Sequence, residues 1–472
     1  MSVSPSPSPS PLPAELPIAL DRGRGVPLAV QLADALRAAA AAGQLRSGDR
    51  LPSTRMLAAH LGVSRTVTAA AYEQLHAEGW IDGRHGSGTF VTTTPPGARA
   101  RPAPAPLQEP RQDDVVHLVP GAAWAEGLDR AAWRRAWRAA ADEPPLILPR
   151  RAGLPSFRAA VAEHLLRHRG LVVPDESERR DPVLATAGTT AAVTELAHAV
   201  LRPGDRVAVE EPGYQRAVGA FRAAGMEVVG VPVDSDGLVV AAVPDRVRAV
   251  FCSPAHQYPL GGRMPAARRV ELVARARAEG WLVIEDDYDG ELRYDVAPLP
   301  LLAALAPDVV VHLGTTSKIL SPVLGVGWMV APPPVAAAVL AHRERTGTSP
   351  APAGQRVLVA MARHGDLGRH LRRLRRELAA RRAFVVDALT SAGLPVLGDD
   401  AGAHLLVPVP SAEAERRVAE AGAAHGLRLD VLGRHYSGTP DRHGIPVGYT
   451  APTRAQLRAA VPVLVDLLRS AR

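Results

Sequence analysis

A stretch of low complexity near residue 100 divides the chain and limits how it can fold. Residues 92–110, "TTTPPGARARPAPAPLQEP", are dense in Pro, Ala and Arg and have no apolar periodicity. Such a segment cannot bury a core and is expected to form a semi-extended tether. A chain of 472 residues is also too long for one ordinary domain. We therefore expect a disordered Pro- and Ser-rich tail at 1–20, a small domain at 21–94, a linker at 95–112 and a large domain at 113–472.

Composition argues against several classes of protein. Apolar residues make up 47% of the chain, yet no run of transmembrane length is free of Arg, Gly or Pro. The first residues, "MSVSPSPSPSPLPAELP", have neither the charged nor the apolar region of a signal peptide. The single cysteine, Cys252, cannot form an intrachain disulfide, which suits a reducing compartment. We expect a cytoplasmic protein with no membrane partner. Its net charge of +7 permits nucleic-acid binding but does not demonstrate it.

The small domain has the pattern of three helices followed by a hairpin. Apolar residues keep helical spacing in "PLAVQLADALRAAAAAGQL", which stops at Gly43, and a second helix in "LPSTRMLAAHLG" should end at Gly62. Ser64 is a suitable N-cap for a third helix that runs to Gly79. "IDGRHGSGTFVTT" then reads as strand, glycine-rich turn and strand. This order predicts a winged helix-turn-helix.

In such a fold the start of the third helix enters the major groove of DNA. The start of the second helix can contact DNA phosphates, and the hairpin forms the wing. The candidate DNA-binding residues are Ser64, Arg65, Thr66 and Thr68 on the third helix, Ser53 and Arg55 on the second, and Arg84, His85 and Gly86 in the wing. The alternative is a small helical adaptor that contacts no DNA.

A family resemblance favours DNA binding. "LPSTRMLAAHLGVSRTVTAAAYEQLHAEGW" followed by "GSGTFV" resembles the DNA-binding domain of GntR-type regulators in order and spacing. The resemblance implies double-stranded operator DNA as a partner.

The large domain alternates short apolar strands with helices. "RVAVEEP", "RAVFCSP", "WLVIEDD" and "VVVHLGTT" each precede a loop rich in polar or small residues. This order predicts an α/β domain with a mostly parallel sheet, whose ligand site lies at the carboxyl ends of the strands.

One of these loops holds the only lysine of the chain, Lys318, in a sequence that has no asparagine at all. Coding pressure that replaces lysine by arginine explains why lysine is so rare in this chain. Chance could explain why Lys318 alone is retained. A desolvated lysine, however, can lose its proton and attack a carbonyl, which a guanidinium cannot do. The loops also provide a set of polar residues: Gly188, Thr189, Thr190, Tyr214, Arg216, Gln257, Asp286, Tyr288, Thr315 and Ser317.

Taken singly, each of these residues has a structural interpretation, such as a helix cap or a turn contact. Together they match the needs of pyridoxal phosphate, which requires a lysine, an acid for the ring nitrogen, a phosphate cup and an aromatic lid. Their order resembles fold-type I aminotransferases, and is most similar to the MocR/GabR subgroup of GntR regulators. That resemblance implies a Schiff base at Lys318, Asp286 at the pyridine nitrogen and Tyr288 at the phenolic oxygen. It further implies a homodimer.

The same resemblance assigns the other residues of the set. Tyr214 stacks on the ring and Gln257 belongs to the same cofactor site, while Arg216 grips an effector carboxylate. The phosphate is held by Gly188, Thr189 and Thr315, and Thr190 and Ser317 belong to the same cofactor site.

The chain also departs from the aminotransferase pattern. The family continues from its lysine as Ser-Lys-x-Leu-x-Pro-x-Leu-Arg-x-Gly, and the phosphate-clamping arginine is replaced here by Gly325. The strand "HGIPVGYT" lacks the carboxylate-binding arginine of the enzymes, and Arg442 lies near it but not on it. These departures argue against efficient transamination.

Three functions remain open. The first is a transcription regulator that binds pyridoxal phosphate and senses an amino compound or the vitamer. The second is an aminotransferase with an accessory DNA-binding domain. The third is a regulator whose large domain is a scaffold without cofactor. No metal site is expected.

Overall fold

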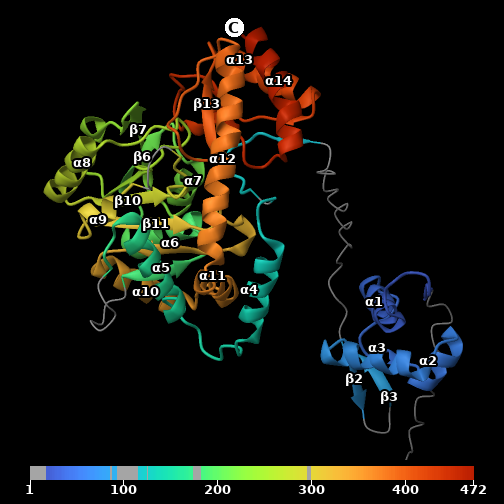
Figure 1. Ribbon diagram of the computed structural model, residues 1–472. Helices are drawn as coiled ribbons and strands as arrows, with labels where there is room; N and C mark the ends of the chain where they lie inside the picture. The colour runs from blue at the N-terminus through green and yellow to red at the C-terminus, as the bar shows by residue number, and fades with distance from the viewer. Residues whose placement is uncertain (1–17, 85–87, 93–114, 125, 174–181, 295–298) are drawn as a thin grey trace, which may run out of the picture. The chain divides into compact units, whose positions relative to one another are not determined.

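The chain folds as two compact units, Met1–Pro110 and Arg111–Arg472. The computed structural model describes residues 18–84, 88–92, 115–124, 126–173, 182–294 and 299–472 (Figure 1). The predicted tail and linker lie almost wholly outside these residues.

The small unit is a winged helix-turn-helix, as predicted. Its helices are α1 (Leu28–Ala41), α2 (Thr54–Leu61) and α3 (Arg65–Ala77). The hydroxyl oxygens of Ser53 and Ser64 accept hydrogen bonds from the backbone N–H groups of Met56 and Val67, which fixes the starts of α2 and α3. Gly62 ends α2 with φ of 62°, a left-handed conformation that favours glycine.

The wing is the antiparallel pair β2 (Ile81–Arg84) and β3 (Gly88–Val91). A short strand that the sequence did not predict, β1 (Arg50–Leu51), pairs with the other edge of β3, so the sheet order is β1-β3-β2. Buried side chains such as Leu32, Leu36 and Leu75 form the core between helices and wing.

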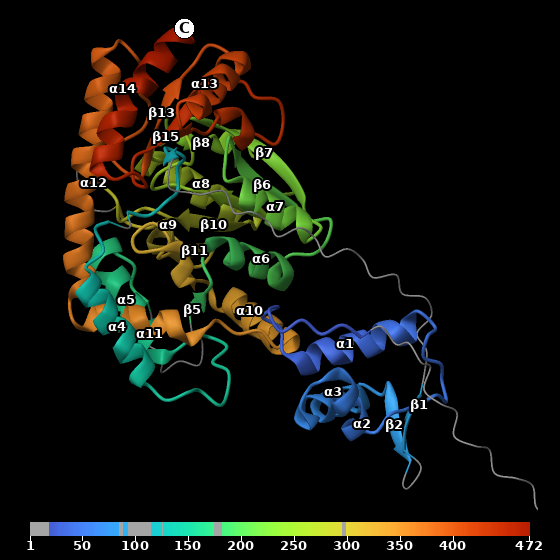
Figure 2. The same ribbon diagram turned by 90° about the vertical axis from the view of Figure 1, so that its right-hand side faces the viewer.

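An eight-stranded sheet organises the large unit (Figures 1 and 2). Its order is β5-β12-β11-β10-β9-β6-β7-β8, and only β12 and β8 run antiparallel to their neighbours. The prediction of a mostly parallel sheet is therefore confirmed. The strands are β5 (Val183–Thr186), β6 (Arg206–Glu211), β7 (Glu227–Asp234), β8 (Gly237–Leu238), β9 (Ala249–Cys252), β10 (Leu282–Asp287), β11 (Val310–Thr315) and β12 (Gly327–Val330).

Helices cover both faces of this sheet because its strands are apolar on both sides. Ile284, Val311 and Met329 pack with helices on one face, and Val283, Val310 and Trp328 pack on the other. The first face carries α6 (Thr189–Val200), α7 (Gln215–Ala223) and α10 (Pro333–Thr346). The remaining helices before the carboxyl-terminal part are α4 (Arg130–Asp142), α5 (Pro155–Arg169), α8 (Ala266–Glu279), α9 (Leu302–Leu305) and α11 (Pro352–Arg363).

The carboxyl-terminal part packs at one end of the large unit, and the long helix α12 (Asp366–Ser391) runs from it along the molecule (Figure 2). The predicted apolar positions of α12, Leu371, Leu374 and Leu378, are buried. This part further contains the antiparallel pair β13 (His404–Pro408) and β15 (Gly444–Gly448), the parallel pair β4 (Val116–His117) and β14 (Leu427–Arg428), and the helices α13 (Ala412–Ala424) and α14 (Arg454–Ser470). No described helix is long and apolar enough to cross a membrane.

Candidate functional site

A cavity of about 490 Å³ opens at the carboxyl ends of the central strands. Nine of the ten residues predicted to bind the cofactor line it, and so does Arg216. The residues come from segments that are far apart in the sequence: the starts of α6 and α7, the ends of β10 and β11, and the carboxyl-terminal part. Parallel strands bring their carboxyl ends to one edge, which is why these segments meet.

The start of α6 forms one wall of the cavity. Gly188 precedes the helix with φ of 108° and provides no side chain to cap it, so the first N–H groups of α6 face the cavity residues. The buried Oγ1 of Thr189 makes no hydrogen bond of ordinary geometry, but it lies near enough to the Asp286 carboxyl to lower the pKa of that group. Thr315 Oγ1 and Ser317 Oγ lie 2.9 Å apart at the end of β11. Free N–H groups and hydroxyls around a helix start suit a phosphate.

Asp286 lies on the floor of the cavity. Side chains alternate along β10, so Asp286 points to the same face as Ile284, while Glu285 and Asp287 point to the opposite face. Asp286 is 3% exposed, and its Oδ1 has no hydrogen-bond partner. Burial raises the pKa of this carboxyl to about 8, so it keeps its proton at neutral pH. A buried carboxyl with an unused oxygen suits a ring nitrogen that carries or accepts a proton.

Lys318 reaches into the cavity from the loop after β11. Its Nζ donates a hydrogen bond to the backbone oxygen of Gly121 at 2.5 Å. Burial lowers the pKa of the amine, while the negative charge of Asp289 acts in the opposite direction, as would that of Asp286 once it is ionised. Gly121 has φ of 102°, and a Cβ there would lie 3.1 Å from Nζ, so only glycine leaves this room. A half-buried amine of lowered pKa is suited to attack a carbonyl.

Aromatic and basic side chains form the upper walls. The hydroxyl groups of Tyr214 and Thr190 are 3.0 Å apart, which orients the tyrosine ring at the start of α7. Arg216 and Arg434 both line the cavity. Arg434 is neutralised by a two-point ion pair with Asp430, so Arg216 is the better candidate for an anion.

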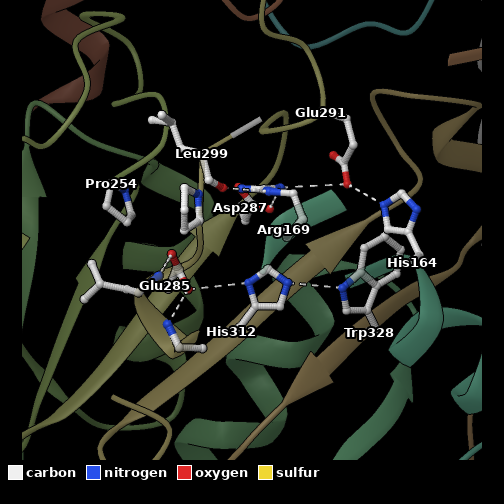
Figure 3. Close-up of polar contacts among 12 residues, drawn as sticks. His164, Arg169, Pro254, Glu285, Asp287, Glu291, Leu299, His312 and Trp328 are labelled. Atoms are coloured by element: carbon white, nitrogen blue, oxygen red, sulfur yellow. Dashed lines mark hydrogen bonds and ion pairs between the residues drawn. The ribbon is translucent and has the colours of Figure 1, made fainter. Parts of the chain in front are cut away.

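A second set of polar contacts supports the site from the other face of the sheet (Figure 3). Arg169 makes a two-point ion pair with Asp287, and both side chains are buried. Glu285 accepts hydrogen bonds from the N–H groups of Leu302 and Ala303 at 2.7 and 3.1 Å. These contacts hold the end of β10, and therefore Asp286, in place.

The structure corrects the prediction for Gln257. Its amide nitrogen donates to the backbone oxygens of Pro212 and Tyr258, and its side chain is 1% exposed and absent from the cavity lining. The next residue, Tyr258, lines the cavity instead. His404, at the start of β13, is a second lining residue that the sequence analysis missed. Tyr258 could have been suspected from the sequence, because it lies in the same loop, "HQYPLGG", as Gln257. A sequence does not show which of two adjacent side chains faces the cavity.

Gly325 follows the short helical turn Pro322–Leu324 with φ of 61°, and its Cβ position has no neighbour within 4 Å. There is room for a side chain at this position, but a residue other than glycine would be strained.

On the small unit, Arg65 and Thr66 are exposed at the start of α3, and Arg55 is exposed on α2. Ser53 and Ser64 are also exposed and serve as N-caps. Thr68 needs a correction, because its side chain is fully buried and donates to the backbone oxygen of Thr54 at 2.8 Å. It fixes the angle between α2 and α3 and is not available to a base.

His85 and Gly86 lie outside the described residues, and only the backbone of Arg84 is described, in β2.

Comparisons with known proteins agree with this geometry. Residues 121–429 match the family "Aminotransferase class I and II", and residues 28–91 match "Bacterial regulatory proteins, gntR family". A kynurenine aminotransferase of Pyrococcus horikoshii has the same fold, with a TM-score of 0.68 and 23% identity over 76% of this chain and 92% of that one. The chain therefore joins a GntR-type winged helix to an aminotransferase-like domain.

Relatives of full length share both parts. The "HTH-type pyridoxine biosynthesis transcriptional regulator PdxR" of Corynebacterium glutamicum is 36% identical over 96% of this chain and 98% of that protein. The "Probable rhizopine catabolism regulatory protein MocR" of Rhizobium meliloti is 32% identical over 96% of this chain and 95% of that protein. The chain belongs to this family of MocR/PdxR-type transcriptional regulators.

Proposed function

We propose that the large unit binds pyridoxal phosphate through Lys318 and that this binding controls the affinity of the small unit for operator DNA. The observation that carries the proposal is the position of the only lysine of the chain, half-buried in a cavity that also contains the buried carboxyl of Asp286 and the open start of α6. Bound pyridoxal phosphate supplies an aldehyde that condenses with amines and a ring that withdraws electrons.

Each residue has a physical task in this proposal. Lys318 provides the amine, and its lowered pKa increases the fraction that is free to react. Asp286 holds a proton opposite the ring nitrogen, and Tyr214 covers the ring. The N–H groups after Gly188, with the hydroxyls of Thr189, Thr190, Thr315 and Ser317, hold the phosphate.

The ligand that the regulator senses is proposed to be the vitamer. With Gly325 in place of an arginine, the phosphate cup relies on N–H and hydroxyl donors, so occupancy should follow the cofactor level of the cell. The relative from Corynebacterium glutamicum, named for pyridoxine biosynthesis, supports this choice. An amino compound with a carboxylate is the second candidate, because Arg216 lines the cavity beside Lys318.

Covalent trapping tests the proposal. Purified protein incubated with pyridoxal phosphate and reduced with borohydride should carry the adduct on Lys318, as located by peptide mass spectrometry. Lys318→Ala and Lys318→Arg should carry none there. An adduct on the amino terminus alone, or no adduct, would contradict the proposal. Turnover with an amino donor and a keto acid would instead support an aminotransferase.

We also propose that the protein is a homodimer, as its resemblance to MocR/GabR-type regulators implies. Its DNA-binding unit further supports a place of action in the cytoplasm. Light scattering of the full chain should give twice the mass of 49.7 kDa. A monomer at micromolar concentration would contradict this part of the proposal.

A further inference from the structure

Three buried side chains lie against the cavity wall behind Tyr288. His256 follows β9, Asp289 follows β10 and His404 begins β13, and each is 2% exposed. Of these, only His404 lines the cavity, together with Tyr288. The His256 and His404 rings are 5.0 Å apart, so the cluster joins the central sheet to the carboxyl-terminal part. None of the roles proposed above uses His256, and Asp289 enters only through its charge, which acts on the pKa of Lys318.

His256 makes both of its polar contacts through one ring nitrogen. Its Nδ1 lies 3.0 Å from Asp289 Oδ2 and 3.0 Å from the hydroxyl oxygen of Tyr288. Its other nitrogen, Nε2, is buried without a partner. Gly402 packs against the ring edge, where a Cβ would lie 2.0 Å from Cε1, so a larger residue at this position would displace the ring from the carboxylate.

These contacts determine where the hydrogen atoms lie. A carboxylate only accepts hydrogen bonds, so the Nδ1 that contacts Asp289 carries a hydrogen. Nε2 is then a neutral acceptor without a partner, which costs less than a buried charge without one. The Nδ1–H group also lies within reach of the Tyr288 oxygen, which can accept from it. The hydroxyl hydrogen of Tyr288 is then free for another acceptor.

We propose that Asp289 fixes His256 in the Nδ1–H tautomer and thereby directs the hydroxyl hydrogen of Tyr288 into the cavity, toward an oxygen of the bound cofactor. Asp289 and His256 are positioning residues, because they act through Tyr288 and do not touch the ligand. This inference rests on the proposed function for the ligand that receives the hydrogen bond. Burial raises the pKa of Tyr288 well above its ordinary value, so the group remains a neutral donor.

The same three residues could be read as a metal site, since their ligand atoms lie within 4.8 Å of one another. The distances favour hydrogen bonds. The nitrogen of His256 stands 3.0 Å from each of two oxygens, which is ordinary hydrogen-bond spacing. His404 Nε2 lies 3.2 Å from the backbone oxygen of Pro259, so this nitrogen serves as a donor.

The first test needs no cofactor. The tautomer of His256 is read from ¹⁵N shifts of the full chain labelled at histidine, with the His256→Gln spectrum identifying the signal. The wild type should show the Nδ1–H form. Asp289→Asn can donate its amide hydrogen to Nδ1, so His256 should change to the Nε2–H form, whereas Tyr288→Phe should leave the tautomer unchanged. A wild-type Nε2–H form, or no change in Asp289→Asn, would overturn the proposal.

The second test measures the dissociation constant of pyridoxal phosphate by equilibrium dialysis. Asp289→Asn reverses the hydrogen bond between His256 and Tyr288, so affinity should fall by about tenfold, as for the loss of one hydrogen bond. The double variant with Tyr288→Phe should bind no more weakly than Tyr288→Phe alone, because both changes remove the same contact. Additive losses would overturn the proposal. Asp400→Asn is the matched control, because this aspartate is exposed and makes its ion pair with Arg382 outside the cluster; it should bind as the wild type does.

The two tests separate this inference from the proposed function. If the wild type binds no pyridoxal phosphate, the proposed function fails, while the tautomer measurement still decides whether Asp289 controls His256.

Discussion

Lys318 shows how the environment of one residue can be inferred from its rarity. In a chain that uses arginine for nearly every positive charge, the single lysine is half-buried, donates a hydrogen bond to a backbone oxygen and lies within electrostatic reach of Asp289 and Asp286. The sequence predicted the residue because its chemistry differs from that of arginine. It could not predict Gly121, because the contact joins positions that are 197 residues apart.

The carboxyl of Asp286 should make the cofactor-free protein sensitive to pH. Its folded-state pKa of about 8 lies above the ordinary value of 3.8, so the folded state holds a proton that the unfolded state has lost. The free energy of unfolding should therefore fall as pH rises through this window, by up to about 1.4 kcal/mol per unit. Asp286→Asn should remove this contribution.

Urea unfolding of both proteins at pH 5 and pH 7.5 measures the effect. The variant should gain stability relative to the wild type as pH rises, and it should bind pyridoxal phosphate more weakly. Parallel pH profiles would show that the carboxyl is not held in its neutral form.

Gly325 allows a direct test of the phosphate cup. An arginine there should tighten cofactor binding by about 1–3 kcal/mol through a charged hydrogen bond. The left-handed backbone, with φ of 61°, should at the same time lower the stability of the fold by about 1–2 kcal/mol. Gly325→Ala is the matched control, because it introduces the same strain without the charge. Equal affinities of the Arg and Ala variants in equilibrium dialysis would show that no anion lies within reach of this position.

At the scale of elements, local signals predicted most of the structure. Ser53, Ser64 and Gly62 act on the backbone next to them, and their helix ends were found where the sequence placed them. The strand β1 was missed because two residues carry no periodicity, and only pairing with β3 defines it. Thr68 and Gln257 were placed on the wrong surfaces for a related reason. Which side of a helix or loop is buried depends on the packing partner, which neighbouring residues do not specify.

The start of α3 is where we expect DNA specificity. Arg65 is exposed there, and Arg65→Ala should weaken binding by about 1–3 kcal/mol if it reads a base. If it meets only a phosphate, all DNA sequences should lose affinity alike. The slope of the logarithm of the binding constant against the logarithm of salt concentration should then decrease in magnitude by about one. His76→Ala, at the other end of the same helix, is the control and should bind normally. Unchanged binding by Arg65→Ala in a gel shift at matched salt would contradict this placement of the helix.

Thr68 should behave differently from Arg65. Thr68→Val keeps the volume but removes the hydrogen bond to Thr54, so it should lower the stability of the small unit by about 1–3 kcal/mol. The DNA affinity of the folded fraction should stay close to that of the wild type. Urea unfolding and a gel shift check the two expectations, and a loss of affinity without a loss of stability would restore Thr68 as a contact.

At the scale of the whole molecule, control of transcription requires coupling between the two units. A ligand can shift the DNA-bound state only if it binds two states of the protein with different affinity. Under the function proposed above, such a difference would arise at Lys318, because its hydrogen bond to the Gly121 oxygen would be lost if the amine condensed with the cofactor. Gly121 follows β4, which pairs with β14 of the carboxyl-terminal part. A shift of Gly121 after loss of its contact with Lys318 could therefore be passed through β4 to the carboxyl-terminal part.

The most direct test of this account is the affinity of the full chain for a DNA fragment that it has itself selected in vitro, measured with and without saturating pyridoxal phosphate. We predict a change of about fivefold or more for the wild type, within the usual range of coupling between sites. Lys318→Ala should show no change while binding the DNA as tightly as the cofactor-free wild type. An unchanged affinity of the wild type, or an equal response from Lys318→Ala, would contradict the claim that the lysine connects the cavity to DNA binding.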